Sequence, residues 1–184
     1  MRNLFLLFFF LPCFCFSQEE LLRSWDDVWI NGKLKVFGIK DLRCIDSVLG
    51  RADSICTPGM DVIGVGYAYS SSGIVSYPDA DFTIYDTNYF SMDNINFVNQ
   101  PKGIYVNFGT QILTSETTID DVRKHLDIHE YLDSAEHIEE IAGKFLKVRQ
   151  LEYTPKVNCT DGPYWIFDFF ENKLVRMTFS PGGA

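Results

Sequence analysis

Hydrophobic and polar side chains alternate most regularly near the C-terminal end of the chain, over residues 164–179. Alternation with a period of two on both sides of a short polar break is typical of a half-buried antiparallel hairpin. A three-residue turn over 171–173 would place Asp168 opposite Arg176 on one face, which is a favourable cross-strand pair. Shifting the register by one residue would place Arg176 against Phe169, so we predict the first register. On the other face, the predicted pairs are Phe169 with Val175, Phe167 with Met177 and Trp165 with Phe179.

Turn and capping residues predict the elements of the first half of the chain. Asn31-Gly32 is the strongest two-residue turn signal, so residues 28–36 are predicted to form a hairpin. Asp41 can cap a helix whose apolar stripe ends before Gly50, the predicted stop. Strands are predicted at 65–69, 75–77, 82–85 and 95–98, with a turn at 71–73 between the first two.

The second half repeats this order of elements. Residues 105–107 match 29–31 as a strand leading into a turn. Thr118 can cap a helix as Asp41 does, with Asp121 three residues further on as a shortened capping box. We therefore predict an α+β fold of two tandem copies of a hairpin-helix-antiparallel sheet unit, each with its helix packed on one sheet face. The predicted organisation is a polar lead-in at 18–27, repeat 1 at 28–99 and repeat 2 at 100–184, where 145–153 and the C-terminal hairpin form the sheet.

A short sequence at the end of the first predicted helix carries a family resemblance. Leu49-Gly50-Arg51-Ala52-Asp53 is followed by a predicted strand hairpin and then by the whole unit again. This arrangement resembles the tandem-repeat domains of the β-lactamase inhibitor protein and is similar to the single-repeat, SmpA-type small outer-membrane lipoproteins. Ala52 stands where those families commonly have proline, and the second copy, Leu126-Asp127, lacks the glycine. The resemblance implies a binding protein of the cell envelope that uses a concave sheet surface against another protein.

The first 17 residues have the features of a signal peptide. Arg2 provides a positive charge, residues 4–11 an apolar run, and Cys15 and Ser17 the small residues before a cleavage site ahead of Gln18. We expect an exported protein, periplasmic or extracellular. The alternative is a lipid anchor on Cys13 or Cys15. The rest of the chain has no second apolar run of membrane length, so no membrane span is predicted.

Charge and cysteine content restrict the partners and covalent links. The chain has 16 basic and 25 acidic side chains and a net charge of −9, which argues against nucleic acid and anionic membrane surfaces as partners. Export permits disulfides, but three cysteines follow the predicted signal peptide, which leaves one thiol over. We favour a disulfide between Cys44 and Cys56 because they are close in sequence. The alternative is that these two and Cys159 are all free.

The sequence contains no complete catalytic or metal-binding motif. His125 and His129 have the spacing of two ligands on one helix face, with Asp133 further along, but Leu126 stands where a zinc-protease helix carries glutamate. No serine lies in a Gly-x-Ser-x-Gly turn, and no histidine is placed near Cys159 by sequence. We therefore predict no catalytic residue, no metal and no cofactor, and a protein that is not an enzyme.

Aromatic side chains are the remaining candidates for binding. An exposed aromatic surface would suit a protein partner or the stacking of sugar rings; the alternative is that these rings fill the space between the two halves. We predict an exported, non-catalytic protein-binding module of the cell envelope or the secreted fraction, and as the alternative a carbohydrate-binding protein or glycoside hydrolase. The predicted contact residues are Tyr85, Tyr89, Phe90, Tyr153, Tyr164 and Phe170.

Overall fold

The structure, a computed structural model, describes residues 27–56, 71–85, 89–98, 103–124, 131–154 and 164–180. Over these residues the chain is mostly β, with two antiparallel sheets and two short helices. The prediction of an α+β fold made of two helix-on-sheet units is therefore wrong. The predicted signal peptide at 1–17 and the predicted strand at 65–69 lie outside the described residues.

The small sheet joins two hairpins that are far apart in the sequence. Its strand order is β2-β1-β7-β8, with β1 (Val28–Ile30), β2 (Leu34–Lys35), β7 (Val106–Phe108) and β8 (Gln111–Leu113). Asn31 and Gly32 form the first turn with φ values of 52° and 62°, which confirms the predicted hairpin. The two hairpins meet along β1 and β7, where the Asn31 amide donates to the Tyr105 carbonyl at 2.9 Å and the Tyr105 amide donates to Asn31 Oδ1 at 3.0 Å.

The large sheet also takes strands from both halves of the chain. Its order is β10-β11-β12-β13-β6-β5-β4-β3, and β9 pairs with β11 beside β10. At its centre the last strand of the chain pairs with a strand of the first half, through Met177 and Ile95. The predicted boundary at residue 99 stays a prediction. The strands are β3 (Ser54–Cys56), β4 (Ser71–Tyr77), β5 (Ala80–Tyr85), β6 (Tyr89–Asn96), β9 (Tyr131–Asp133), β10 (His137–Ile141), β11 (Lys144–Tyr153), β12 (Tyr164–Phe170) and β13 (Lys173–Ser180).

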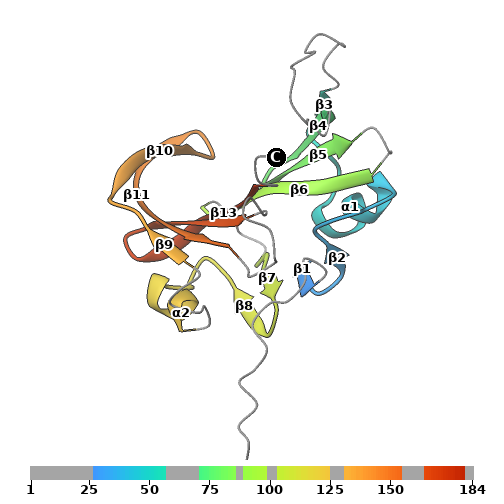
Figure 1. The fold of residues 1–184 in the computed structure, drawn as a ribbon. Helices are drawn as coiled ribbons and strands as arrows, with labels where there is room; N and C mark the ends of the chain where they lie inside the picture. Colours follow the sequence, from blue (N-terminus) through green and yellow to red (C-terminus); the bar gives the residue numbers. More distant parts are fainter. Residues whose placement is uncertain are drawn as a thin grey trace, which may run out of the picture.

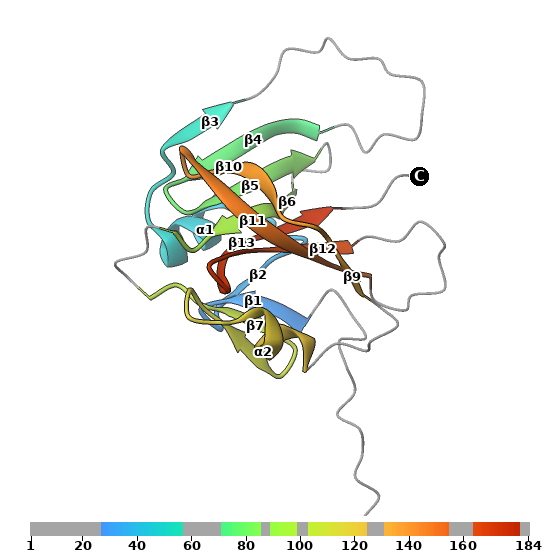
Figure 2. The same cartoon turned by 90° about the vertical axis from the view of Figure 1, so that its left-hand side faces the viewer.

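The small sheet covers one face of the large sheet, and the main core lies between them (Figures 1 and 2). Phe108 of β7 packs edge-on against Trp165 and Phe167 of β12, with ring centroids 5.4 Å apart in both cases. Phe108 also lies 6.1 Å from the ring of Tyr153. Burial of these large rings is the main source of stability, because the hydrophobic gain grows with the apolar area removed from water.

The two helices are correctly predicted in position but are too short to form a layer. In α1 (Leu42–Leu49), the Asp41 carboxylate accepts from the Arg43 amide, and the helix ends at Gly50 with φ of 90°. In α2 (Ile119–Arg123), Thr118 and Asp121 form the predicted capping box. Helices of five and eight residues bury only one or two side chains each, whereas the small sheet supplies a continuous apolar layer. This is why the fold class differs from the prediction.

The C-terminal hairpin has the predicted register except next to its turn. Trp165 pairs with Phe179, Phe167 with Met177 and Asp168 with Arg176, as predicted, but Phe169 pairs with Leu174 rather than with Val175. The turn has two residues, Glu171 and Asn172, with φ values of 49° and 63°. Such turns match the twist of a hairpin better than a three-residue turn does, so the extra residue is taken up as a bulge. The predicted turn at 71–73 is also wrong, because β4 begins at Ser71.

Candidate functional site

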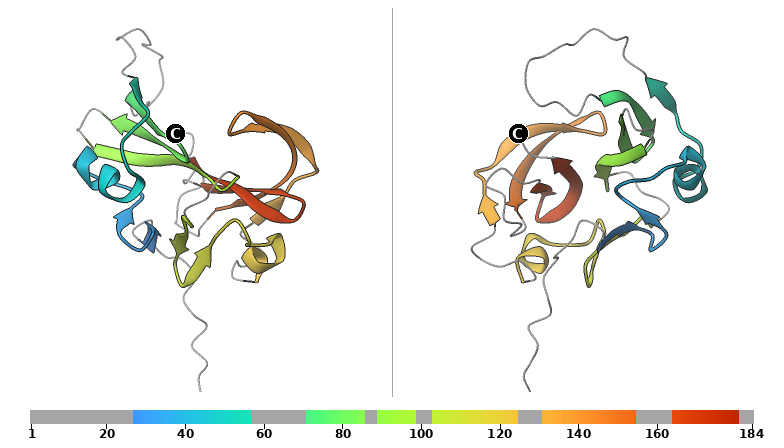
Figure 3. Two further views of the ribbon diagram at one scale, coloured as in Figure 1. Left: turned by 180° about the vertical axis from the view of Figure 1, so that it is seen from behind. Right: turned by 45° about the vertical axis from the view of Figure 1, so that its right-hand side comes forward.

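The hairpin of β10 and β11 bends away from the rest of the large sheet (Figure 3). Its turn consists of Ala142 and Gly143, both with positive φ, and pairs Ile141 with Lys144. Directly paired residues share a face, so the register places Ile138 and Lys147 on one face and His137 and Val148 on the other. The hairpin therefore has two distinct surfaces.

One of these surfaces carries the most exposed large hydrophobic side chains among the described residues. Phe145 is 76% exposed and Ile138 is 72% exposed. Both lie on the same face as Lys147, diagonally across the two strands. We call Ile138 and Phe145 the hairpin patch. The hairpin patch is a candidate interaction site, because exposed apolar side chains gain free energy when a partner removes them from water.

The opposite face of the hairpin is anchored to the centre of the large sheet. Ile141 and Val148 are buried together with Val175, the residue that the bulge of β13 turns to this face. Arg176 Nε donates to Asp168 Oδ2 at 2.6 Å, and its Nη2 donates to Glu139 Oε2 of β10 at 3.2 Å. An apolar cluster and an ion-pair chain thus hold the hairpin in its bent position.

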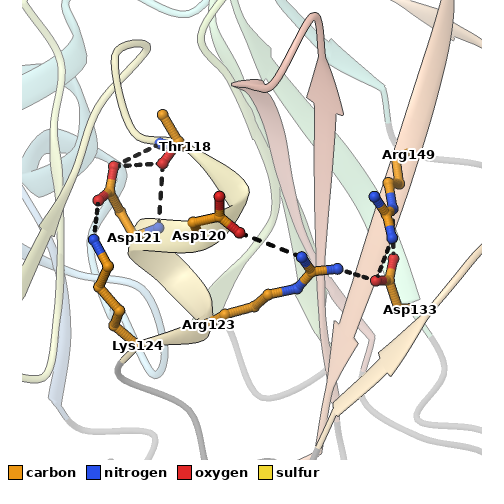
Figure 4. A network of polar contacts seen from close by, with 7 residues as sticks. All are labelled: Thr118, Asp120, Asp121, Arg123, Lys124, Asp133 and Arg149. Atoms are coloured by element: carbon orange, nitrogen blue, oxygen red, sulfur yellow. Dashed lines mark hydrogen bonds and ion pairs between the residues drawn. The ribbon is translucent and has the colours of Figure 1, made fainter.

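The base of the hairpin is tied to α2 by a second polar network (Figure 4). The Asp133 carboxylate accepts two hydrogen bonds from Arg149, from Nε at 2.8 Å and from Nη2 at 2.7 Å, and it also pairs with Arg123 of α2. At the start of the helix, hydrogen bonds from the Thr118 hydroxyl and backbone and from Lys124 lower the pKa of Asp121 to about 2. The hairpin patch therefore extends from a base that is held on both faces.

A second surface is formed by the outer face of the small sheet. Its paired residues make one row across all four strands: Lys35 beside Trp29, Trp29 beside Asn107 and Asn107 beside Ile112. We call these four residues the outer row. The neighbouring residues Val28, Ile30, Val106 and Leu113 point into the core, so the row faces away from it. The Lys35 ammonium lies 5.2 Å from the centre of the Trp29 ring.

A small cavity opens beside the outer row. It has a volume of about 180 Å³ and is lined by Gly103, Ile104, Tyr105, Ile112, Thr114 and Ser115. Asn107 pairs with Ile112 but is not itself one of the residues that line the cavity, and its Oδ1 is buried without a hydrogen-bond partner among the described residues. A Cβ atom added to Gly32 would lie 3.6 Å from both the Tyr105 hydroxyl and Asn107 Oδ1.

The predicted contact residues do not form one surface. Tyr153 is 1% exposed and belongs to the main core, so it is not available to a partner in the folded protein. Phe90 packs against the same core, and Phe170 packs against the apolar cluster under the hairpin. Tyr89 and Tyr164 are half-buried at strand ends, and the side chain of Tyr85 lies outside the described residues.

The residues of the two surfaces were missed in the sequence for different reasons. Ile138 lies between His137 and Glu139 in an acidic segment for which the sequence predicts no strand. Phe145 belongs to the predicted strand 145–153, but that prediction does not assign its side chain to either face of the sheet. The sequence predicts Trp29 in a strand and Asn107 at the turn after the matching strand, and does not predict that their pairing joins the two hairpins. The alternation of Leu146 and Val148 with Lys147 and Arg149 is the local signal that places Phe145 on the outward face of the strand.

The cysteine and metal predictions have different outcomes. Cys44 and Cys56 are free and exposed, so the predicted disulfide between them is wrong. Cys44 lies on α1 and Cys56 on the edge strand β3. Among the described residues there is no group of three or more His, Cys, Asp or Glu side chains placed to hold a metal ion. His125, His129 and Cys159 lie outside those residues.

Comparison with known proteins finds no matching family model, no similar curated protein and no similar solved structure. The resemblance to the β-lactamase inhibitor protein and to the SmpA-type lipoproteins therefore stays a prediction. Neither of the described helices is long and apolar enough to cross a membrane.

Proposed function

We propose that this protein is an exported, non-catalytic binding module that recognises another protein through the hairpin patch. The observation that carries the proposal is the exposure of Phe145 and Ile138 on a single face. Aromatic side chains are enriched among the residues that dominate protein–protein affinity, and exposed apolar side chains gain free energy when a partner covers them. Export rests on the signal-like features of residues 1–17.

The anchoring of the hairpin supports recognition without a large ordering cost. Binding costs free energy for every segment that must become ordered, so a patch on an already fixed element binds more tightly than the same side chains on a mobile loop. The buried cluster around Val148 fixes one face, and the Asp133 network fixes the other. The partner meets a preformed surface.

The position of β10 adds a second means of recognition. It is the terminal strand in the order of the large sheet, and its described pairing is with β11 alone. An edge strand can accept a strand of a partner through backbone hydrogen bonds, while side chains such as Ile138 provide specificity. The preferred partner is thus a protein that offers an extended segment next to an apolar pocket.

Photo-crosslinking tests this proposal. A photoreactive phenylalanine analogue at position 145 is expected to form a covalent adduct with a protein of the source organism's envelope or secreted fraction. Excess unlabelled protein should prevent the adduct, and excess Phe145→Ser/Ile138→Ser protein should not. Ile55, which is 56% exposed on the opposite edge of the large sheet, is the matched control position. No adduct at position 145, or an equal adduct at position 55, would contradict the proposal.

A further inference from the structure

The open edge of β10 presents the backbone groups of two particular residues. Among the described strands β10 pairs with β11 alone, and the turn between them consists of two residues with positive φ (Figure 3). A turn of this kind is closed by a hydrogen-bonded pair, here Ile141 and Lys144. Hydrogen bonding alternates along antiparallel strands, so Glu140 and Ile138 do not use their backbone groups toward β11. Their amides and carbonyls therefore point to the open edge, where a partner strand can bind them.

The Glu140 carboxylate is available to a partner, because the side chain is exposed. The ion pairs of the described residues join Glu136 to Lys147 and Glu139 to Arg176, whereas none of them engages Glu140. The chain as a whole carries a net charge of −9. A cationic side chain opposite Glu140 is therefore favoured both by this carboxylate and by the field of the whole protein.

An arginine fits this position better than a lysine. Phe145 lies directly opposite Glu140 on β11, and the two side chains share the face of the hairpin patch. Side chains in such a pair have Cβ atoms about 4.5–5.5 Å apart, so one cation can reach both. A planar guanidinium can form two hydrogen bonds to a carboxylate and can stack on an aromatic ring, whereas an ammonium group is a compact, strongly hydrated charge. Glu140 and Phe145 together thus form a binding position for an arginine side chain.

The next position along the edge favours an aliphatic side chain. Ile138 is 72% exposed on the same face as Glu140. Lys147 lies directly opposite Ile138, so a second basic residue of the partner would meet a like charge there. An aliphatic residue instead covers Ile138, and both side chains are removed from water.

We infer that the partner contributes a β-strand that pairs antiparallel with β10, with an arginine opposite Glu140 and an aliphatic residue opposite Ile138. Antiparallel pairing is the more stable arrangement per residue, and it fixes the order of the partner's residues as arginine, any residue, aliphatic residue. The inference rests on the proposed function, because it assigns the chemistry of the segment that meets the hairpin patch. It adds a sequence requirement that the exposure of the patch alone does not contain.

Titration with synthetic peptides, followed by nuclear magnetic resonance, tests the inference. The probe is a peptide with blocked ends, Thr-Thr-Arg-Thr-Ile-Thr-Thr, added at millimolar concentration to the purified protein. We expect it to shift the amide resonances of Ile138 and Glu140. A peptide with glutamate in place of arginine should bind at least about fivefold more weakly, because an attraction becomes a repulsion. A peptide with arginine and isoleucine exchanged, and one with both of their amides N-methylated, should also bind more weakly. Equal binding of all four peptides, shifts confined to the opposite edge strand β3, or no shift with any of them would overturn the inference.

A charge exchange separates recognition from folding. The variant Glu140→Arg should lose binding of the arginine peptide and gain binding of the glutamate peptide, which a misfolded protein would not do. Asp53→Asn removes an exposed carboxylate beside the opposite edge strand β3 and is the control, which should bind as the wild type does. If Glu140→Arg binds both peptides as the wild type does, or if Asp53→Asn weakens binding equally, the assigned position of the arginine is wrong.

The peptide titration and the crosslinking at position 145 can fail separately. An adduct at position 145 without peptide binding refutes the arginine-containing strand and leaves the hairpin patch as a protein-binding surface. Peptide binding in the expected order of affinity without an adduct refutes the proposed partner in the envelope or secreted fraction, and supports the strand chemistry assigned to β10.

Discussion

Replacing Arg176 by methionine is the most informative perturbation of the fold. Asp168 is completely buried, and the only hydrogen bond to its carboxylate among the described residues comes from Arg176 Nε at 2.6 Å. The Arg176 side chain is itself 18% exposed, so solvent screens this pair weakly. Methionine fills a similar space but offers no charge. The variant therefore leaves a buried carboxylate without compensation.

The expected cost follows from this geometry. Removing one partner of a buried ion pair typically costs about 3–5 kcal/mol, because the remaining charge is neither hydrated nor paired. A domain of this size loses roughly 2–4 °C in melting temperature for each kcal/mol. The variant Arg176→Met should therefore melt at least about 6 °C below the wild type. The additional contact to Glu139 is longer and more exposed, and contributes less.

A double-mutant cycle measured by urea unfolding checks the reasoning. Asp168→Leu together with Arg176→Met removes both charges, and the double variant should be clearly more stable than Arg176→Met alone. Arg43→Met is the control, since Arg43 and Asp41 form a pair that is exposed to solvent. It should unfold close to the wild-type urea midpoint. If Arg176→Met is as stable as this control, or if the double variant is no better than the single one, the buried pair does not have the assigned role.

Three further predictions concern the pH dependence of α2, the core and the thiols. The Thr118 hydroxyl holds the pKa of Asp121 at about 2, below its ordinary 3.8. The carboxylate therefore stabilises the folded state above pH 3.8, and this contribution is lost as the pH falls through about 2. The difference in urea midpoint between wild type and Asp121→Asn should shrink over that range. Phe167→Ala should cost about 3–5 kcal/mol by calorimetry, because it empties a fully buried site; a cost below about 1 kcal/mol would contradict the core assignment. Cys44 and Cys56 should both react with a maleimide in the folded, unreduced protein, and protection of both would restore the disulfide.

Local elements were predictable where a few neighbouring residues determine the backbone. The Asn31-Gly32 turn, the Asp41 cap and the Thr118 capping box all depend on contacts within about four residues. The pairing of Asp168 with Arg176 was also correct, because alternation and opposite charge indicate the same register. The error next to the turn arose from Glu171, which adopts positive φ although this is uncommon for glutamate.

The fold class and the surfaces were not predictable because they depend on pairings across the whole chain. Nothing near Trp29 indicates that its strand will join β7, and this joining creates the layer that covers the large sheet. Tyr153 and Phe145 are an even number of residues apart on β11 and therefore lie on the same face of the strand. Tyr153 is nevertheless in the core, and Phe145 is exposed. Their difference comes from the bend of the hairpin beyond the area that the small sheet covers, a property of packing rather than of residue type.

The central position of β13 has a consequence for how the chain reaches its native state. β13 follows all the other described strands along the chain yet pairs with β6 in the middle of the large sheet, so the edge of β6 at residues 94–96 stays open until residues 176–178 are available. Contacts between such distant segments slow folding, and an open edge invites aggregation with other chains during the delay.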